Sequence, residues 1–297
     1  QALFLLEGGP RISEDDGAYC RARRRLPLSE FPKALAATAQ AAEQAVTPLT
    51  WLQGRPVKVV DGSSLTLPDT PANRAAYPPV EASPRHFPML RLVVLFSVAS
   101  GAILALAQGN LFASELSLLG LLLGQLAPAD IVVGDRGFGN FVILAVLRGL
   151  GIDFLGRSVR RVDGRRRVRR LGQQDWLVVW KKGAAPSLWL SLAQWAGLPA
   201  QLTVRVVRGR CFQKGFRVRQ VTLVTTLLDA ELYTAQELLQ ASLRRWRLEM
   251  CLDDLKTTLQ MEMLRSHSPA MVQKELYARL LGHNLVRWTM GQAAREH

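Results

Sequence analysis

Three acidic residues stand where a carboxylate is costly unless it has a partner. Asp61 directly follows the apolar run at residues 57–60, and Asp135 directly follows a second apolar run at residues 131–134. Glu249 lies beside a leucine stripe in a long expected helix. A carboxylate at the edge of a core needs hydrogen-bond donors or a cation. Three such acids in a basic chain favour divalent cations, although each aspartate alone is also typical of a strand end that caps the next turn.

The chemistry that suits this group is cleavage or transfer of a phosphodiester. That reaction must activate a water or a 3′-hydroxyl and stabilise a leaving oxygen, and two Mg²⁺ ions about 4 Å apart, held by carboxylates, do both. Mg²⁺ prefers oxygen ligands. The four histidines have no metal-site spacing and are interpreted as surface or core residues, with His267 a candidate phosphate contact. We therefore predict a Mg²⁺ site at Asp61, Asp135 and Glu249, with Mn²⁺ as a substitute.

A long helix is expected with Thr234 as its N-cap, and at residues 242–269 it carries a line of polar side chains beside its leucine face. Ser242, Arg245, Glu249 and Lys256 fall within an arc of about 60° at 3.6 residues per turn. Leucines recur beside them at steps of four, three and four, which is the spacing of one buried helix stripe. Taken alone, the polar line is equally well explained as a solvated flank with an Arg–Glu pair worth about a few tenths of a kcal/mol.

Composition points to a polyanionic partner. The chain has 297 residues, of which 48% are hydrophobic, and a net charge of +14. So large a surplus of arginine predicts binding to nucleic acid. A membrane surface fits less well, because the charge is scattered rather than carried by one amphipathic helix. The three cysteines are far apart and form no CxxC pair, which indicates reduced thiols in a cytosolic protein.

The apolar and turn-forming residues predict a mixed sheet with helices packed on it. Strands are expected at residues 57–60, 91–96, 103–107 and 131–133. Helices are expected at residues 31–46 with Ser29 as N-cap, from Ser114 to about residue 126, at 140–150 and at 269–295. The last of these is expected to bury Leu276, Leu280, Leu281, Leu285 and Trp288. Residues 68–90 contain six prolines and are expected to be an irregular loop.

Residues 153–227 differ in composition from the rest of the chain. They hold a dense arginine run at residues 160–170, and strands are expected at 176–180, 188–192, 202–207 and 216–223. This composition predicts a β-rich insertion. A second arginine cluster at residues 21–25 is interpreted either as a set of phosphate contacts or as a solvated turn before a helix. The predicted organisation is a basic, helical DNA-contacting segment at 1–50, a core at 51–152 and 220–297, and the insertion at 153–219.

Three motifs together resemble those of the DDE transposases of bacterial insertion sequences. They read Asp61-Gly-Ser, Gly134-Asp-Arg-Gly-Phe and Arg245-Trp-Arg-Leu-Glu-(x6)-Lys256. The narrower likeness is to the branch with a Tyr-x2-Arg-x3-Glu-x6-Lys signature. It covers residues 18–295, including the stretch at 19–28 that resembles the segment before the catalytic core in that branch. The third motif is the most specific of the three.

The resemblance implies a ribonuclease-H-like core, with acids on the first strand, on the fourth strand and on a later helix. It also implies a β-rich insertion between the second and third acids. In this family pattern Asp61, Asp135 and Glu249 are the catalytic metal ligands. Arg245 and Lys256 match the residues that contact the phosphates at the transposon ends.

Further DNA contacts are expected from residues in or near the motifs and in the basic run, namely Arg136, Ser242, Trp246, Arg165, Arg166 and Arg167. One position departs from the family pattern, because Ser242 stands where the signature has tyrosine. A serine can donate a hydrogen bond but cannot stack on a base or sugar. The departure therefore concerns the positioning of the cut end and not metal binding.

The expected function is DNA transposition by Mg²⁺-dependent hydrolysis at transposon ends and strand transfer into target DNA. The expected partners are double-stranded DNA, both terminal repeats and target, and a second copy of the chain in a homodimer, with no membrane. The expected location is the bacterial cytoplasm, associated with the nucleoid. Two alternatives stay open: a ribonuclease-H-like nuclease that cuts without joining, and an inactive or co-opted transposase-derived protein that only binds DNA.

Overall fold

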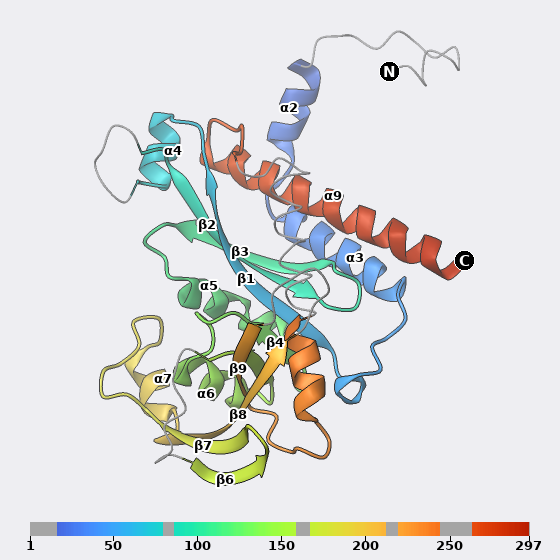
Figure 1. The fold of residues 1–297 in the computed structure, drawn as a ribbon. Helices are drawn as coiled ribbons and strands as arrows, with labels where there is room; N and C mark the ends of the chain where they lie inside the picture. The colour runs from blue at the N-terminus through green and yellow to red at the C-terminus, as the bar shows by residue number, and fades with distance from the viewer. Residues whose placement is uncertain (1–16, 80–85, 159–166, 212–218, 244–262, 297) are drawn as a thin grey trace.

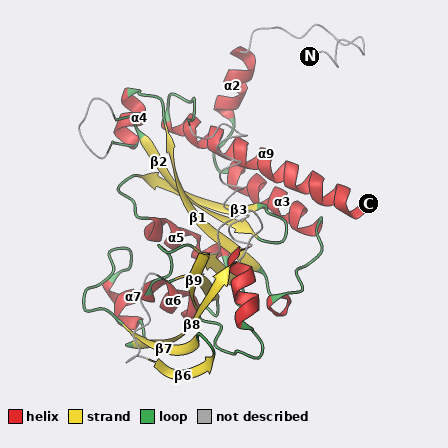
Figure 2. Ribbon diagram, in the orientation of Figure 1, coloured by secondary structure: helices red, strands yellow, loops and turns green. Residues whose placement is uncertain are grey.

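A computed structural model describes residues 17–79, 86–158, 167–211, 219–243 and 263–296. Its first five strands are β1 (Val57–Thr66), β2 (Met89–Ser97), β3 (Ile103–Asn110), β4 (Ile131–Gly134) and β5 (Asp153–Arg157). β1 pairs antiparallel with β2, and β2 with β3, whereas β1, β4 and β5 run parallel. This order, β3-β2-β1-β4-β5, is the ribonuclease-H-like arrangement that the sequence predicted (Figures 1 and 2).

β1 is longer than the apolar run that predicted it. Its pairing with β2 extends from Lys58 opposite Ser97 to Thr66 opposite Met89. Asp61 therefore lies inside a strand and not at its end, which corrects the expectation from the sequence. The reason is that the antiparallel partner continues to supply hydrogen bonds after the parallel partner β4 has ended.

The remaining strands extend the same sheet. They are β6 (Arg167–Gly172), β7 (Asp175–Lys181), β8 (Gln201–Cys211) and β9 (Arg219–Thr225). β9 pairs with β5 on one side and β8 on the other, so the β-rich segment continues the core sheet at the end far from α2 and α9 in Figure 1. β5 falls within the range expected for the insertion, yet it pairs in parallel with β4.

Helices cover both faces of the sheet. α3 (Glu30–Gln44) and α9 (Pro269–Glu296) pack side by side on one face, and α5 (Glu115–Leu122) and α6 (Phe141–Gly149) pack on the other (Figure 1). Alternation along β1 places Val59 in the core beneath α9 and Val60 in the core beneath α6. The described part of the chain has no helix that is both long and apolar enough to cross a bilayer.

Helix starts follow the expected capping chemistry at two positions and depart from it at a third. Ser114 accepts a hydrogen bond from the third residue of its helix, and Asn140 caps α6 through two backbone amides. Residues 123–125 continue after α5 as a 3₁₀ turn. Ser29 precedes α3, but its hydroxyl makes no capping bond and instead contacts Glu30.

Three local expectations were wrong. The proline-rich segment contains a helix, α4 (Pro71–Ala76), because proline is tolerated in the first helical turn and Thr70 caps it. The expected strand at 188–192 is instead a turn that leads into α7 (Leu192–Gly197), whose start is fixed by a capping box between Ser191 and Gln194.

The third concerns the far end of α9. Leu276 and Leu280 are buried as expected, but the side chains of Leu285 and Trp288 are 48% and 39% exposed. At this end the buried positions of α9 are Asn284 and Gly291, and Gly291 lies against Ala45 and Val46 at the end of α3. Leu285 and Trp288 fall outside this line of contact.

Candidate active site

Two of the predicted acids come from neighbouring parallel strands. The register of β1 and β4 pairs Val57 with Ile131 and Val59 with Val133. Two further residues along each chain bring Asp61 level with Asp135. Because neighbouring strands lie about 4.8 Å apart, the two aspartates stand beside each other where β4 ends.

Backbone amides hold both carboxylates in place. The N–H of Gly62 donates to Oδ1 of Asp61 at 2.9 Å, and the N–H of Gly137 donates to Oδ1 of Asp135 at 2.7 Å. Both aspartates are half-buried. In the described ranges no lysine or arginine forms an ion pair with Asp135. The described residues therefore place no cation in an ion pair with Asp135, while the Gly137 amide fixes the orientation of its carboxylate.

Glu115, which the sequence reasoning missed, reaches the same place from α5. Ser114 caps this helix, so Glu115 begins its first turn. A β-carbon on Gly62 would lie 2.6 Å from Cδ of Glu115. A β-carbon on Gly137 would lie 3.2 Å from Oδ1 of Asp135 and 3.9 Å from Oε2 of Glu115. The carboxylate of Glu115 thus packs against both glycines, beside Asp135.

The two glycines leave room for the carboxylate of Glu115. Neither Gly62 nor Gly137 has a positive φ angle, so their backbones are open to any residue, but a side chain at Gly62 would have to displace the flexible end of Glu115. No local sequence signal marks Glu115, because only the docking of α5 against β1 brings it to Asp135. The site consequently carries three carboxylates on described elements.

These residues fit part of a divalent-metal site. Carboxylate oxygens are the ligands that Mg²⁺ and Mn²⁺ take. Within the described ranges, however, no three His, Cys, Asp or Glu side chains are placed to enclose a metal ion. Glu115 therefore does not complete the set with Asp61 and Asp135, and the third expected ligand, Glu249, lies outside the described residues.

The other predicted contacts are distributed unevenly. Arg136 is exposed in the turn between Asp135 and Gly137. Ser242 is half-buried in a helical stretch at residues 235–243, whose start Thr234 caps through the amide of residue 237. Arg167 begins β6. The remaining candidates lie outside the described residues: Arg165, Arg166, Arg245, Trp246 and Lys256.

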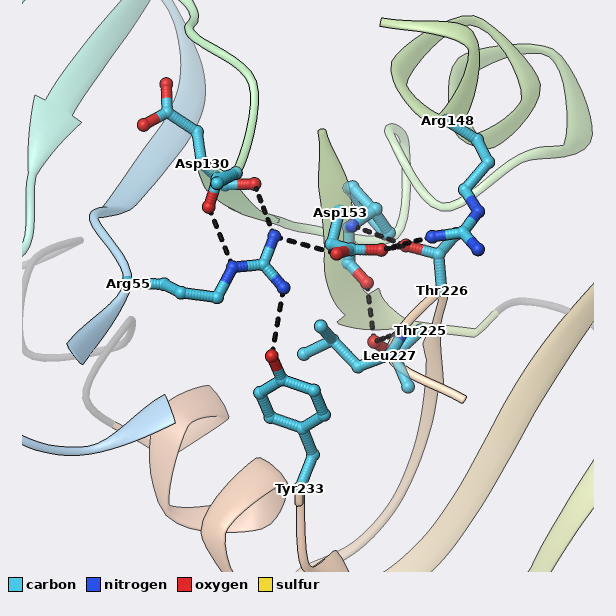
Figure 3. A network of polar contacts seen from close by, with 10 residues as sticks. Arg55, Asp130, Arg148, Asp153, Thr225, Thr226, Leu227 and Tyr233 are labelled. Carbon is cyan, nitrogen blue, oxygen red and sulfur yellow. Dashed lines mark hydrogen bonds and ion pairs between the residues drawn. The ribbon is translucent and has the colours of Figure 1, made fainter. Parts of the chain in front are cut away.

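The amino ends of the same parallel strands carry a different kind of polar group. Arg55, just before β1, contacts Oδ2 of Asp153 at 2.7 Å and donates to the hydroxyl of Tyr233 at 3.1 Å and to the carbonyl of Ala129 at 2.8 Å (Figure 3). Burial lowers the pKa of Arg55, but the hydrogen bonds to Tyr233 and Asp153 outweigh it and raise the pKa overall. The guanidinium is therefore held in its charged form.

Each acid at this end has a cation. Asp153 also contacts Arg148 at 3.1 Å and accepts a 2.6 Å hydrogen bond from Thr226 (Figure 3). Asp130, which is 2% exposed, contacts Nζ of Lys58 at 2.6 Å. The network joins the starts of β1, β4 and β5 to the chain that follows β9.

A ribonuclease-H-like sheet with carboxylates level with each other, one within β1 and one directly after β4, is typical of the class of DDE-type catalytic domains. The sequence matches the family "Transposase DDE domain" over residues 52–285, and the chain belongs to this family. DDE transposase domains generally depend on divalent metal ions.

Two proteins that are similar to this chain are a curated transposase and a solved structure. The transposase InsG for insertion sequence element IS4, from Escherichia coli strain K12, is 29% identical over 99% of this chain. The chain spans 65% of the length of InsG. A piggyBac transposase, solved in a synaptic complex with hairpin DNA, aligns with a TM-score of 0.48 and 9% identity over 86% of this chain and 51% of that one.

Proposed function

We propose that this chain is the catalytic part of a DNA transposase of an insertion sequence. In the proposed reaction, water attacks the phosphodiester at a transposon end and releases a 3′-hydroxyl. That hydroxyl then attacks a phosphodiester of target DNA, forming one new P–O bond as another breaks. The observation that carries the proposal is the register that sets Asp61 beside Asp135, at the end of β4.

Asp61, Asp135 and Glu249 are the proposed ligands of divalent ions, with Mg²⁺ preferred and Mn²⁺ as a substitute. When bound, such ions lower the pKa of the attacking water and neutralise charge at the phosphate. The chain's own contribution is to fix the carboxylates: amides of Gly62 and Gly137 orient Asp61 and Asp135 before DNA arrives.

DNA would be held by cations around these acids. Arg136 is exposed within the Asp135 turn, and Arg245 and Lys256 are assigned to the phosphates of the transposon end by the family motif. We extend this assignment to Ser242, Trp246 and the basic run that includes Arg165, Arg166 and Arg167. Transposon end and target DNA are the proposed substrates, with a homodimer as the working unit in the bacterial cytoplasm, close to the nucleoid.

The test is cleavage of a duplex that carries the terminal repeat of the element encoding this chain, in Mg²⁺ and in EDTA. We expect cut strands and, with a target duplex added, joined strands. An Asp135→Ala or Glu249→Ala variant that cuts at the parent rate would refute the assignment. Cutting without joining would instead identify a nuclease.

A second candidate function rests on Ser242, which replaces the signature tyrosine. In this alternative the chain binds DNA but does not process it. DNA binding together with an absence of metal-dependent cleavage, restored by Ser242→Tyr, would show that this single substitution had removed the activity.

A further inference from the structure

A cavity of about 1080 Å³ lies away from the acids, between α2 (Gly17–Arg25), the start of α3 and the first half of α9. Figure 1 shows α2 standing on this part of α9. We call it the α2–α9 groove. Among the described residues, its lining includes Arg23, Arg24, Arg265, His267, Lys274 and Arg279, and one acid, Glu275.

Two of these charged residues, Lys274 and Glu275, hold the walls of the groove in place. Lys274 is 7% exposed, and its Nζ donates to the carbonyls of Arg23 at 3.3 Å and Arg24 at 2.8 Å. Lysine donating to the last carbonyls of a helix satisfies groups that otherwise lack partners. Lys274 thereby fastens the end of α2 to α9.

Glu275 fixes the opposite wall. It accepts hydrogen bonds from the amides of Arg265 and Ser266 and contacts Arg279 at 2.7 Å. Burial raises the pKa of Glu275, but hydrogen bonds from Ser266, Arg279 and Arg265 outweigh it, so the pKa is lowered overall. The one acid among the described lining residues is thus engaged by the chain itself, and these lining residues together carry a net positive charge.

The arginines of α2 and of the segment before α9 remain at the groove surface. Arg24 and Arg265 are exposed. Nε of Arg23 is buried and has no hydrogen-bond partner within the part of the chain that the structure describes. A buried donor without an acceptor is unusual in folded proteins. Leu26 and Met271 also line the groove, so it combines apolar surface with guanidinium groups, which are common contacts of DNA phosphates.

The groove also stands at a defined distance from the candidate active site. The amide of Leu264 donates to the carbonyl of Thr66 at 3.0 Å, which places Arg265 at the far end of β1. Thr66 follows Asp61 by five residues on this strand, or about 17 Å at 3.3 Å per residue. Duplex DNA rises 3.4 Å per base pair, so this separation corresponds to about five base pairs.

We propose that the α2–α9 groove binds the phosphate backbone of duplex DNA about five base pairs from the phosphate that reacts at Asp61 and Asp135. The inference rests on the proposed function, since it assumes that the acids act on DNA. It assigns the arginine cluster of α2 to phosphate contact rather than to a solvated turn.

The test compares two double variants with equal loss of charge. Arg24→Gln with Arg265→Gln removes two groove cations, and Lys181→Gln with Arg295→Gln removes two exposed cations elsewhere, one of them at the far end of α9. Binding of a 30-base-pair duplex of arbitrary sequence is followed by fluorescence anisotropy between 50 and 300 mM salt. Each lost phosphate contact reduces the slope of log affinity against log salt by about 0.9.

We expect the groove variant to bind about tenfold more weakly at low salt, with a slope reduced by about 1.8, and the control variant to follow the parent. In an end-bearing duplex, a methylphosphonate about five base pairs from the cut should weaken the parent and leave the groove variant unaffected. Equal unfolding midpoints of the proteins exclude misfolding.

Three outcomes would overturn the inference. If both double variants keep the parent slope while the parent binds and cuts DNA, the groove does not contact the backbone and the proposed function stands. If poly-glutamate binds the parent through the groove arginines and duplex DNA does not, the groove docks an acidic protein. If the parent neither binds nor cuts DNA, the proposed function fails together with the inference.

Discussion

The acids near the two ends of the parallel strands β1, β4 and β5 have opposite kinds of bonding partner. At the amino ends, Asp130 and Asp153 are buried and each contacts a cation. Where β4 ends, Asp61 and Asp135 are half-buried and accept bonds from backbone amides, and a third carboxylate, Glu115, packs beside them.

This difference separates acids that support the fold from acids suited to bind a cation. A buried carboxylate paired with arginine has its charge neutralised, and removing either partner leaves a costly buried charge. A carboxylate oriented by amides retains negative potential, and neighbouring carboxylates repel one another until a cation binds. Substitutions at the two ends should therefore affect different measurements.

The largest expected effect is on cleavage. Asp135→Asn should reduce the rate of DNA cleavage by about 1000-fold, because metal-supported charge neutralisation is worth several kcal/mol. In metal-free buffer its free energy of unfolding should stay equal to the parent's or rise slightly as repulsion is relieved. Asp130→Asn, at the amino ends of the strands, is the matched control. We expect it to lower the free energy of unfolding and to leave the cleavage rate per folded molecule close to the parent's. A large loss of stability in Asp135→Asn would contradict this distinction, because it would show that Asp135 also supports the fold.

Next in size is the effect of removing a paired acid. Asp153→Ala leaves Arg55 without its carboxylate, and the side chain of Arg55 is only 18% exposed. We expect urea denaturation to show a loss of about 3 kcal/mol. Arg148→Ala removes the partner that is 51% exposed and should cost less than about 1 kcal/mol. Similar losses in both variants would mean that burial does not determine how much these ion pairs contribute to the free energy of unfolding.

A smaller effect is expected at Gly62. Its substitution by alanine places a methyl group 2.6 Å from the flexible end of Glu115, which must turn away. Unfolding should change by less than about 1 kcal/mol, whereas cleavage should fall about tenfold, as for residues that support metal ligands. Glu115→Gln should lose a similar factor, and adding Gly62→Ala to Glu115→Ala should cost nothing more. Additive losses in that double variant would contradict the proposed contact.

The smallest effect concerns Glu275, a paired acid that belongs to neither of these two groups. Its pKa is lowered in the folded chain, so its stabilisation is present above the ordinary pKa near 4.5 and is lost as pH falls through the folded value. Glu275→Gln should cost about 1 kcal/mol at neutral pH. Between pH 5 and 3 the free energy of unfolding should fall less steeply in the variant than in the parent. Parallel curves would show that Glu275 does not contribute in this way.

Local patterns predicted much of this fold. The apolar runs located β2, β3 and β4, and Ser114, Asn140 and Thr234 marked helix starts, because capping depends on neighbours in sequence. The same reasoning failed where a distant partner decides the outcome. β1 continues past Asp61 because β2 pairs with it. No residue near Asp61 in the sequence indicates this pairing.

By itself, then, the sequence determined the family, the fold class, the strands and caps of the core, and two aspartates next to buried strands. Only the tertiary structure decided that Asp61 stands level with Asp135, that Glu115 fills the space beside Gly62, and that Lys274 joins α2 to α9. The physical reason is the separation in sequence between the residues that interact. Periodicity and capping arise from residues a few positions apart, whereas register and helix docking depend on contacts between segments that the sequence keeps far from one another.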